Sequence, residues 1–328
     1  MKSDQQAGTP TVHGRSSGDD DWVEVIEVGT RDGLQIERYV VPAQRKIEII
    51  NDMIDSGLRS IEVTSFVSPK AVPQLADAAE VLAGVRKRDD TCLMALVPNL
   101  KAAERAAQTP LDSGVLLCSA SETHNRKNLN RSIDESLAGF PEVAGRLREA
   151  GIDVRGGMAT VFGCPFEGEA AVEAVLRIVK AYVDLGITHV GLGDTTGMAT
   201  PTNIRYVVRS LKAAFPDVQY TLHLHNTRGI GLANVLVGLE EGVRRFDSSV
   251  AGLGGCPFAA GATGNICTED LVYLLHESGY RTGIDIYKSI EVAKKMESTL
   301  GRQLSGQVMR AGPRLALHEA DAVQTAAG

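Results

Sequence analysis

Short runs of β-branched and apolar residues alternate with longer amphipathic stretches along the chain from Trp22 onward. This alternation is typical of a parallel sheet whose strands are joined by crossover helices. It predicts eight strands, at residues 23–28, 60–66, 92–98, 114–119, 154–160, 189–193, 221–225 and 245–250.

Between the predicted strands, apolar residues recur every three or four positions, as they do on the buried face of a helix. Clear examples are Ile47, Ile50, Ile54 and Leu58, then Val172, Val175, Leu176, Val179 and Val183, then Ile204, Val207, Val208 and Leu211. Eight strands, each followed by a helix, favour a single (β/α)8 barrel. An open doubly wound sheet would need a reversal of strand order, which the sequence neither shows nor excludes.

The length of 328 residues suits one such barrel with an extension at each end. Residues 1–21 are rich in Gly, Ser, Asp, Thr and Gln, which predicts a flexible tail. We assign residues 22–283 to the catalytic barrel, with a last barrel helix at 268–278. Residues 284–328 then form a C-terminal helix, at 284–300, and a tail.

Composition excludes several classes of function. The net charge of -7 is spread along the chain without a Lys/Arg stripe, so a nucleic-acid partner is not expected. No apolar run approaches the roughly 20 residues that span a bilayer, and no secretory signal opens the chain. The five cysteines, irregularly spaced, favour a reduced cytoplasmic protein over a disulfide framework.

Several residues with reactive side chains lie where predicted strands end, and barrel enzymes carry their active sites at that edge. Arg31 and Asp32 follow the first strand, although Asp-Gly is also a common turn. His223 and His225 lie two apart in the seventh strand, so both imidazoles point into the barrel. One inward histidine is more often a core residue, but two at this spacing favour a metal site.

Two further segments carry weaker signals. Asp194 ends the sixth strand and is a partner of the metal ligands, a proton-transfer group or a loop residue; Thr200 and Pro201 after it predict a helix start. Cys256 lies in the glycine-rich segment 252–265, which suits a cover over a ligand. Its thiol is either an acid or base of the site or an incidental small residue.

Several motifs resemble those of the 3-hydroxy-3-methylglutaryl-CoA lyase family, which is related to isopropylmalate synthase. They are Glu-Val-Gly-Thr-Arg-Asp-Gly-Leu-Gln at 27–35, Thr-Ser-Phe-Val-Ser-Pro-Lys at 64–70, Gly-Cys-Pro-Phe-Glu-Gly at 163–168 and Asp-Ser-Ser-Val-Ala-Gly-Leu-Gly-Gly-Cys-Pro-Phe-Ala at 247–259. The resemblance implies a metal ion held by Asp32, His223, His225 and Asn265. This mixed oxygen and nitrogen set suits Mg²⁺ or Mn²⁺ and could also accept Zn²⁺ or Co²⁺. The resemblance also implies catalytic roles for Arg31, Glu62, Asp194, His223 and Cys256.

The activity that the resemblance implies is cleavage of 3-hydroxy-3-methylglutaryl-CoA between C2 and C3, which gives acetyl-CoA and acetoacetate. The expected enzyme is a homo-oligomer without a separate organic cofactor. Asn226 and Arg228 after the second histidine, and Gly191 in the sixth strand, depart from the family pattern. Citramalyl-CoA and longer branched 3-hydroxyglutaryl thioesters therefore stay open as substrates. A condensing synthase is disfavoured because residues 284–328 are too few for a regulatory domain. A non-catalytic barrel is disfavoured because every reactive position is filled.

Overall fold

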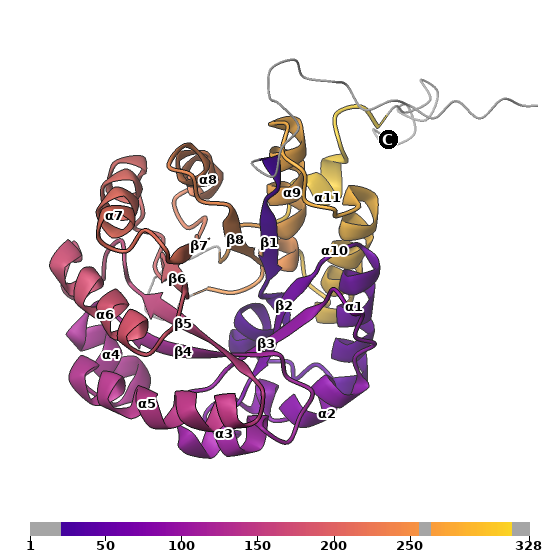
Figure 1. Ribbon diagram of the computed structural model, residues 1–328. Helices are drawn as coiled ribbons and strands as arrows, with labels where there is room; N and C mark the ends of the chain where they lie inside the picture. The colour runs from indigo at the N-terminus through magenta and orange to yellow at the C-terminus, as the bar shows by residue number, and fades with distance from the viewer. Residues whose placement is uncertain (1–20, 256–263, 317–328) are drawn as a thin grey trace, which may run out of the picture.

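The computed structural model describes residues 21–255 and 264–316, and its eight strands form a closed parallel barrel in sequence order (Figure 1). This confirms the (β/α)8 prediction. The strands are β1 (Glu24–Glu27), β2 (Ser60–Ser65), β3 (Cys92–Leu96), β4 (Ser113–Ser119), β5 (Asp153–Ala159), β6 (His189–Gly193), β7 (Gln219–His223) and β8 (Arg245–Ser248).

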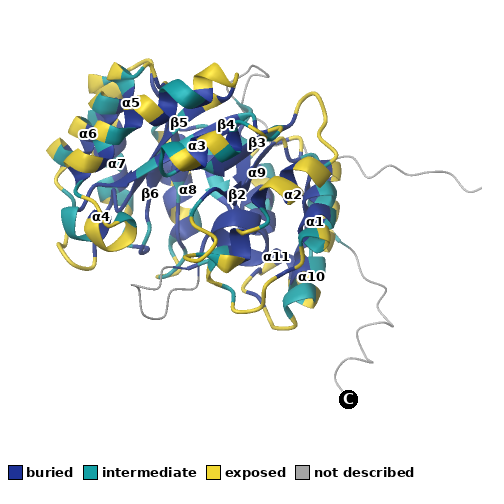
Figure 2. Ribbon diagram, turned by 90° about the horizontal axis from the view of Figure 1, so that it is seen from below, coloured by how far each residue is buried: buried dark blue, intermediate teal, exposed yellow. Residues whose placement is uncertain are grey.

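Helices surround the barrel and cover its outer wall. They are α1 (Ala43–Asp55), α2 (Ala78–Gly84), α3 (Leu100–Ala106), α4 (Glu122–Leu129), α5 (Ile133–Glu149), α6 (Val172–Asp184), α7 (Pro201–Ala214), α8 (Gly231–Glu240), α9 (Thr268–Glu277), α10 (Ile286–Leu300) and α11 (Val308–Ala311). Their exposed residues face outward and their buried residues face the strands (Figure 2). No helix within the described residues is long and apolar enough to cross a membrane.

Strand alternation separates the apolar core from the barrel interior. Ile61 and Val63 of β2 are buried in the layer between strands and helices, whereas Glu62 between them borders a cavity inside the barrel. In β7, Leu222 packs outward and His223 points inward in the same way. Since the interior need not carry the apolar core, it can hold polar and charged groups.

Most predicted strand ends were wrong by one to two residues, and two boundaries bear on the site or on a helix end. Strand β7 begins at Gln219 and ends at His223, so His225 lies beyond the strand, where it forms an isolated bridge with Asn265. The chain turns there because its backbone leaves β6 and pairs with the segment after β8. Helix α1 ends at Asp55 instead of including Leu58, because Gly57 with a φ of 103° breaks the helix.

The helix predicted after Thr200 is confirmed. The Thr200 hydroxyl accepts a hydrogen bond from the Asn203 amide, and Pro201 occupies the first turn of α7. This cap fixes the segment that follows β6 and carries Asp194.

The C-terminal helix packs on the barrel as an extra element. Helix α10 begins after Asp285, which accepts hydrogen bonds from two amides of the first turn, and it lies beside α1 and α9 (Figure 1). Beyond it, Asp270 of α9 accepts hydrogen bonds from the amides of Gln307 and Val308. Of the predicted tails, residues 1–21 and 301–328, only 1–20 and 317–328 lie outside the described part of the chain. The rest is ordered: Asp21 pairs with Arg281, and residues 308–311 form α11, whose Val308 and Met309 are buried.

Candidate active site

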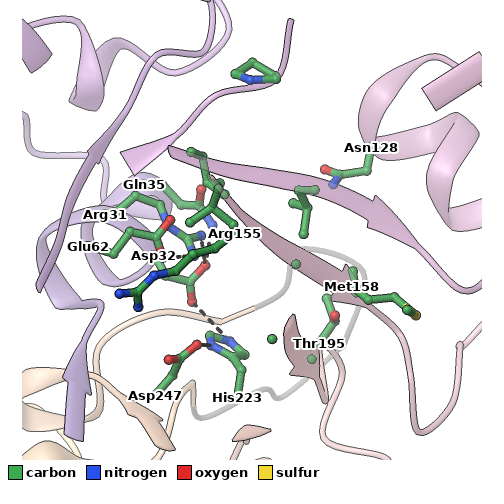
Figure 3. Close-up of a pocket in the computed structure, with 18 of the residues that line it drawn as sticks. Arg31, Asp32, Gln35, Glu62, Asn128, Arg155, Met158, Thr195, His223 and Asp247 are labelled. Atoms are coloured by element: carbon green, nitrogen blue, oxygen red, sulfur yellow. Dashed lines mark hydrogen bonds and ion pairs between the residues drawn. The ribbon is translucent and has the colours of Figure 1, made fainter. Parts of the chain in front are cut away.

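A cavity of about 430 Å³ occupies the barrel interior and opens beyond the carboxyl ends of the strands (Figure 3). Its size is that of a small-molecule site. Predicted site residues that line it are Arg31, Asp32, Glu62, His223 and His225.

Asp32, His223 and His225 bring three potential metal ligands together. One ligand atom from each lies within 4.8 Å of the others, and the two histidine Nε2 atoms are 3.2 Å apart. Asp32 lies in a single π-helical turn, Gly29–Gly33, whose amides return to the Val28 carbonyl. The turn places the carboxylate over the mouth of the barrel, 3.9 Å from His223 Nε2.

Asp247 holds the first histidine in place. Its Oδ2 lies 3.0 Å from His223 Nδ1, and β7 and β8 pair His223 with Asp247 in register (Figure 3). A carboxylate on one ring nitrogen keeps the proton there and leaves Nε2 as the electron-pair donor. His223 Nε2 therefore faces His225 and Asp32 as a potential ligand atom.

Neighbouring charges set the protonation of the three ligands. Burial lowers the pKa of His223, but the hydrogen bond and charge of Asp247 outweigh burial and raise it above the ordinary value. Burial, followed by the charge of His223, lowers the pKa of His225 to about 4. Burial raises the pKa of Asp32, but the charges of Arg31 and the two histidines lower it more, to about 2. Near neutral pH, Asp32 is anionic and His225 is neutral, as metal ligands must be.

Asn265 contacts this group from the segment that follows β8. Its Nδ2 donates to Asp32 Oδ2 at 2.7 Å and to the Leu253 carbonyl at 3.0 Å. Its Oδ1 is buried and has no hydrogen-bond partner among the described residues. An unpaired buried oxygen is costly, and a cation would satisfy it.

Arg31 and Glu62 form a buried ion pair beside the ligands. The guanidinium donates to Glu62 Oε2 at 2.9 Å and to Asp32 Oδ1 at 2.6 Å. Burial raises the pKa of Glu62, whose Oε1 has no partner within the described part of the chain. The charge of Arg31 is thus held in a fixed direction at the cavity wall, which suits stabilisation of a developing anion.

Asp194 lies behind the cavity and does not line it. Its Oδ1 accepts hydrogen bonds from the amides of Met198 and Ala199, at 2.6 and 2.8 Å. Burial outweighs these bonds and raises the pKa to about 7. The carboxylate shapes the turn between β6 and α7, while its predicted part in catalysis stays a prediction.

Cys256 lies outside the described residues, so its predicted role stays a prediction. The described ends of its segment both reach the site: Gly255 lines the cavity, and Gly264 precedes Asn265. The four cysteines that the structure describes are free.

Sequence reasoning missed Asp247 and Gln35. The Gln35 amide donates to Asp32 Oδ1 at 2.9 Å. The alternation Arg245, Phe246, Asp247 would have placed Asp247 inside the barrel, but its pairing with His223 depends on the register of β7 and β8. Gln35 follows the π-helical turn, which the residue pattern does not indicate.

Comparison with known proteins agrees with this geometry. The HMGL-like family model matches residues 22–296. Hydroxymethylglutaryl-CoA lyase YngG of Bacillus subtilis is 42% identical over 86% of this chain and 94% of its own. The mitochondrial hydroxymethylglutaryl-CoA lyase of Gallus gallus is 42% identical over 89% and 98%. An HMG-CoA lyase structure from Acinetobacter baumannii, in complex with coenzyme A and 3-methylmalate, has a TM-score of 0.88 and 44% identity, covering 93% of this chain and 99% of that one.

Proposed function

Because the chain belongs to the HMGL-like family and is a carbon–carbon lyase, we propose that it cleaves 3-hydroxy-3-methylglutaryl-CoA into acetyl-CoA and acetoacetate. The observation that carries this proposal is the Asp32, His223 and His225 cluster in a cavity that also holds the Arg31–Glu62 pair. The relatives named for this activity match the chain over nearly its whole barrel.

The donor set fits a divalent cation. We propose that Asp32, His223, His225 and Asn265 hold Mg²⁺ or Mn²⁺, because a carboxylate, an amide oxygen and two imidazoles form a mixed oxygen and nitrogen set. Support comes from the unpartnered Oδ1 of Asn265 and from the two facing Nε2 atoms. Such an ion, when bound, lowers the pKa of the substrate's C3 hydroxyl.

The protein's own groups orient the substrate and compensate its charge. A base of the site, for which His223 and Asp194 are the predicted candidates, accepts the proton of the C3 hydroxyl. The C2–C3 electron pair then moves to C2, and C3 becomes the ketone carbon of acetoacetate. C2 then takes up a proton and becomes the methyl carbon of acetyl-CoA. Arg31, oriented by Glu62, stabilises the negative charge that develops on the departing enolate. Cys256 is our candidate for the proton donor, in the segment that Gly255 leads into.

A substrate assay tests the proposal. Purified protein, stripped of metal and supplied with Mg²⁺ or Mn²⁺, should release acetyl-CoA and acetoacetate in equal amounts from 3-hydroxy-3-methylglutaryl-CoA. His223→Ala, in the same assay, should lose at least about a hundredfold in kcat, since it removes a ligand. A folded wild-type protein that releases no acetyl-CoA with any divalent metal would contradict the proposal.

Citramalyl-CoA, which would give acetyl-CoA and pyruvate, is the second candidate substrate. It is favoured by the similar lyase structure that holds coenzyme A with 3-methylmalate, a hydroxydicarboxylate. If the protein cleaves citramalyl-CoA but not 3-hydroxy-3-methylglutaryl-CoA, citramalyl-CoA is its substrate and the type of reaction is unchanged. The predicted homo-oligomer and cytoplasmic location stay predictions from the sequence.

A further inference from the structure

A buried carboxyl group joins the turn that carries Asp32 to the segment that follows β8. Glu27, the last residue of β1, has no exposed surface. Its Oε1 accepts hydrogen bonds from the Gly29 amide at 2.7 Å and from the Val250 amide at 2.9 Å. Gly29 begins the π-helical turn of Asp32, and Val250 begins the short turn after β8. One carboxyl oxygen therefore ties the segments that follow the first and the last strand.

The second oxygen of Glu27 holds the start of α9, which lies beside β1 (Figure 1). Thr268 Oγ1 donates to Glu27 Oε2 at 2.6 Å, and Ser248 Oγ, 2.9 Å away, donates to Thr268 in turn. The Thr268 amide donates to the Ser249 carbonyl at 3.0 Å. Thr268 follows Asn265 by three residues, so the short stretch that carries Asn265 is fixed to β8 and to Glu27 together.

The two segments pack against each other as closely as their backbones allow. A Cβ on Gly29 would lie 2.8 Å from Val250 Cγ1, and one on Gly33 would lie 2.8 Å from Leu253 Cβ. Glycine at both positions permits this approach. Because little space separates the segments, a displacement of one is transmitted to the other.

We propose that Glu27 is a positioning residue: its carboxyl group sets the spacing between Asp32 and Asn265, and thereby the affinity of the site for a divalent cation. The two side chains meet where Asn265 Nδ2 donates to Asp32 Oδ2 at 2.7 Å, so a shift of either segment alters this contact. Glu27 does not itself line the cavity, and it acts on a bound ion only through these ligands. The inference rests on the metal site of the proposed function.

Two substitutions at Glu27 separate its hydrogen bonds from its charge. Glu27→Ala removes all the bonds and should raise the dissociation constant for Mn²⁺ by about 10–100-fold, the usual cost of losing a group that orients metal ligands. Burial outweighs the hydrogen bonds and raises the pKa of Glu27 to about 7, so an uncharged side chain of the same shape is tolerated. Glu27→Gln keeps an oxygen for both amides and can donate to Thr268 Oγ1. It should bind Mn²⁺ nearly as the wild type does.

Electron paramagnetic resonance of free Mn²⁺ measures these affinities, at a temperature where every variant is folded. A loss of stability alone does not change the affinity under this condition. Val179→Ala is the matched control, at a buried position of α6, which follows β5 across the barrel from β1. It should lower the melting temperature, because it leaves a cavity in the core, and should bind Mn²⁺ as the wild type does.

A double mutant identifies the route by which Glu27 acts. Coupled positions give effects that do not add, whereas independent ones do. Glu27→Ala should therefore weaken Mn²⁺ binding much less in a protein that already carries Asn265→Ala. Losses that simply add would overturn the proposed route through Asn265.

The remaining outcomes distinguish this inference from the proposed function. A folded Glu27→Ala protein with wild-type affinity overturns the inference alone, as do equal losses in Glu27→Ala and Glu27→Gln or in Glu27→Ala and Val179→Ala. A folded wild-type protein that neither binds Mn²⁺ nor cleaves 3-hydroxy-3-methylglutaryl-CoA overturns the proposed function. Should Glu27→Ala not fold, Thr268→Val decides: it keeps the shape of the side chain, removes its bond to Glu27 and should weaken Mn²⁺ binding, and an unchanged affinity overturns the inference.

Discussion

At the scale of single residues, the site depends on how His223 is held. Its Nδ1 is 3.0 Å from Asp247, so Nε2 is left to face Asp32 and His225. The histidine pair was predictable from its spacing on a strand, because two inward imidazoles need a partner. The role of Asp247 could not be predicted, because its contact with His223 depends on the register between β7 and β8, which the residue pattern of neither strand shows.

Replacing Asp247 tests this arrangement. Asp247→Asn keeps the size of the side chain but removes the charge that fixes the ring, so the affinity for Mn²⁺ should fall by about 10–100-fold. Isothermal titration calorimetry on the metal-free protein measures the change. The exposed Asp217→Asn is the control and should bind Mn²⁺ as the wild type does. Equal affinities in all three proteins would show that Asp247 does not position the ligand.

At the scale of elements, the order of strands and helices could be predicted, and their exact ends could not. Strand alternation and helical periodicity reflect which face of an element is buried, and in this barrel each element buries one face along most of its length. The end of β7 at His223 depends instead on the backbone pairing of His225 with Asn265, far away in sequence. The π-helical turn at Gly29–Gly33 likewise follows from amides that converge on one carbonyl, with no residue pattern of its own.

Helix α9 carries a buried acid that links pH to stability. Glu269 is fully buried, its Oε2 accepts a hydrogen bond from the Ala251 amide, and burial together with the charge of Asp270 raises its pKa to about 8. The unfolded carboxyl has a pKa near 4.5. Between these values the folded chain binds a proton that the unfolded chain lacks, so stability falls as pH rises through this window.

Glu269→Gln should remove this contribution. Between pH 5 and pH 8, its free energy of unfolding should decline less than that of the wild type, by at least about 1 kcal/mol, since one pKa unit corresponds to ~1.4 kcal/mol. Urea unfolding at several pH values gives the two curves. Glu142→Gln, at an exposed position of α5, should follow the wild-type curve. Parallel curves for Glu269→Gln and the wild type would be evidence against a protonated Glu269.

At the scale of the whole molecule, the candidate ligands join the two ends of the barrel. Asp32 follows β1, His223 ends β7, and His225 and Asn265 lie just beyond β7 and β8. The cluster therefore spans the seam where the first strand pairs with the last. A bound ion would stabilise the folded chain by mass action, because the unfolded chain cannot present these groups together.

Metal removal should therefore lower the melting temperature. At a metal concentration of about a hundred times Kd the stabilisation is ~2.7 kcal/mol, which corresponds to a shift of roughly 4 °C for a domain of this size. Differential scanning calorimetry with Mn²⁺ and with a chelator measures the shift. His223→Ala should melt at the same temperature in both. A wild-type protein unaffected by the chelator, with metal shown to be absent, would contradict metal binding at the seam.

The two glycines that flank the segment after β8 bring its ends together. Gly254 and Gly264 have φ values of 101° and 93°, and a Cβ on Gly264 would lie 2.0 Å from the Gly254 carbonyl oxygen. Neither position can accept another residue without moving the backbone next to Asn265. Because the attachment points touch, the residues between them can be exchanged for those of another family member, or lengthened, without displacing the barrel. Any such exchange should keep both glycines, and also Cys256, the proton donor we propose.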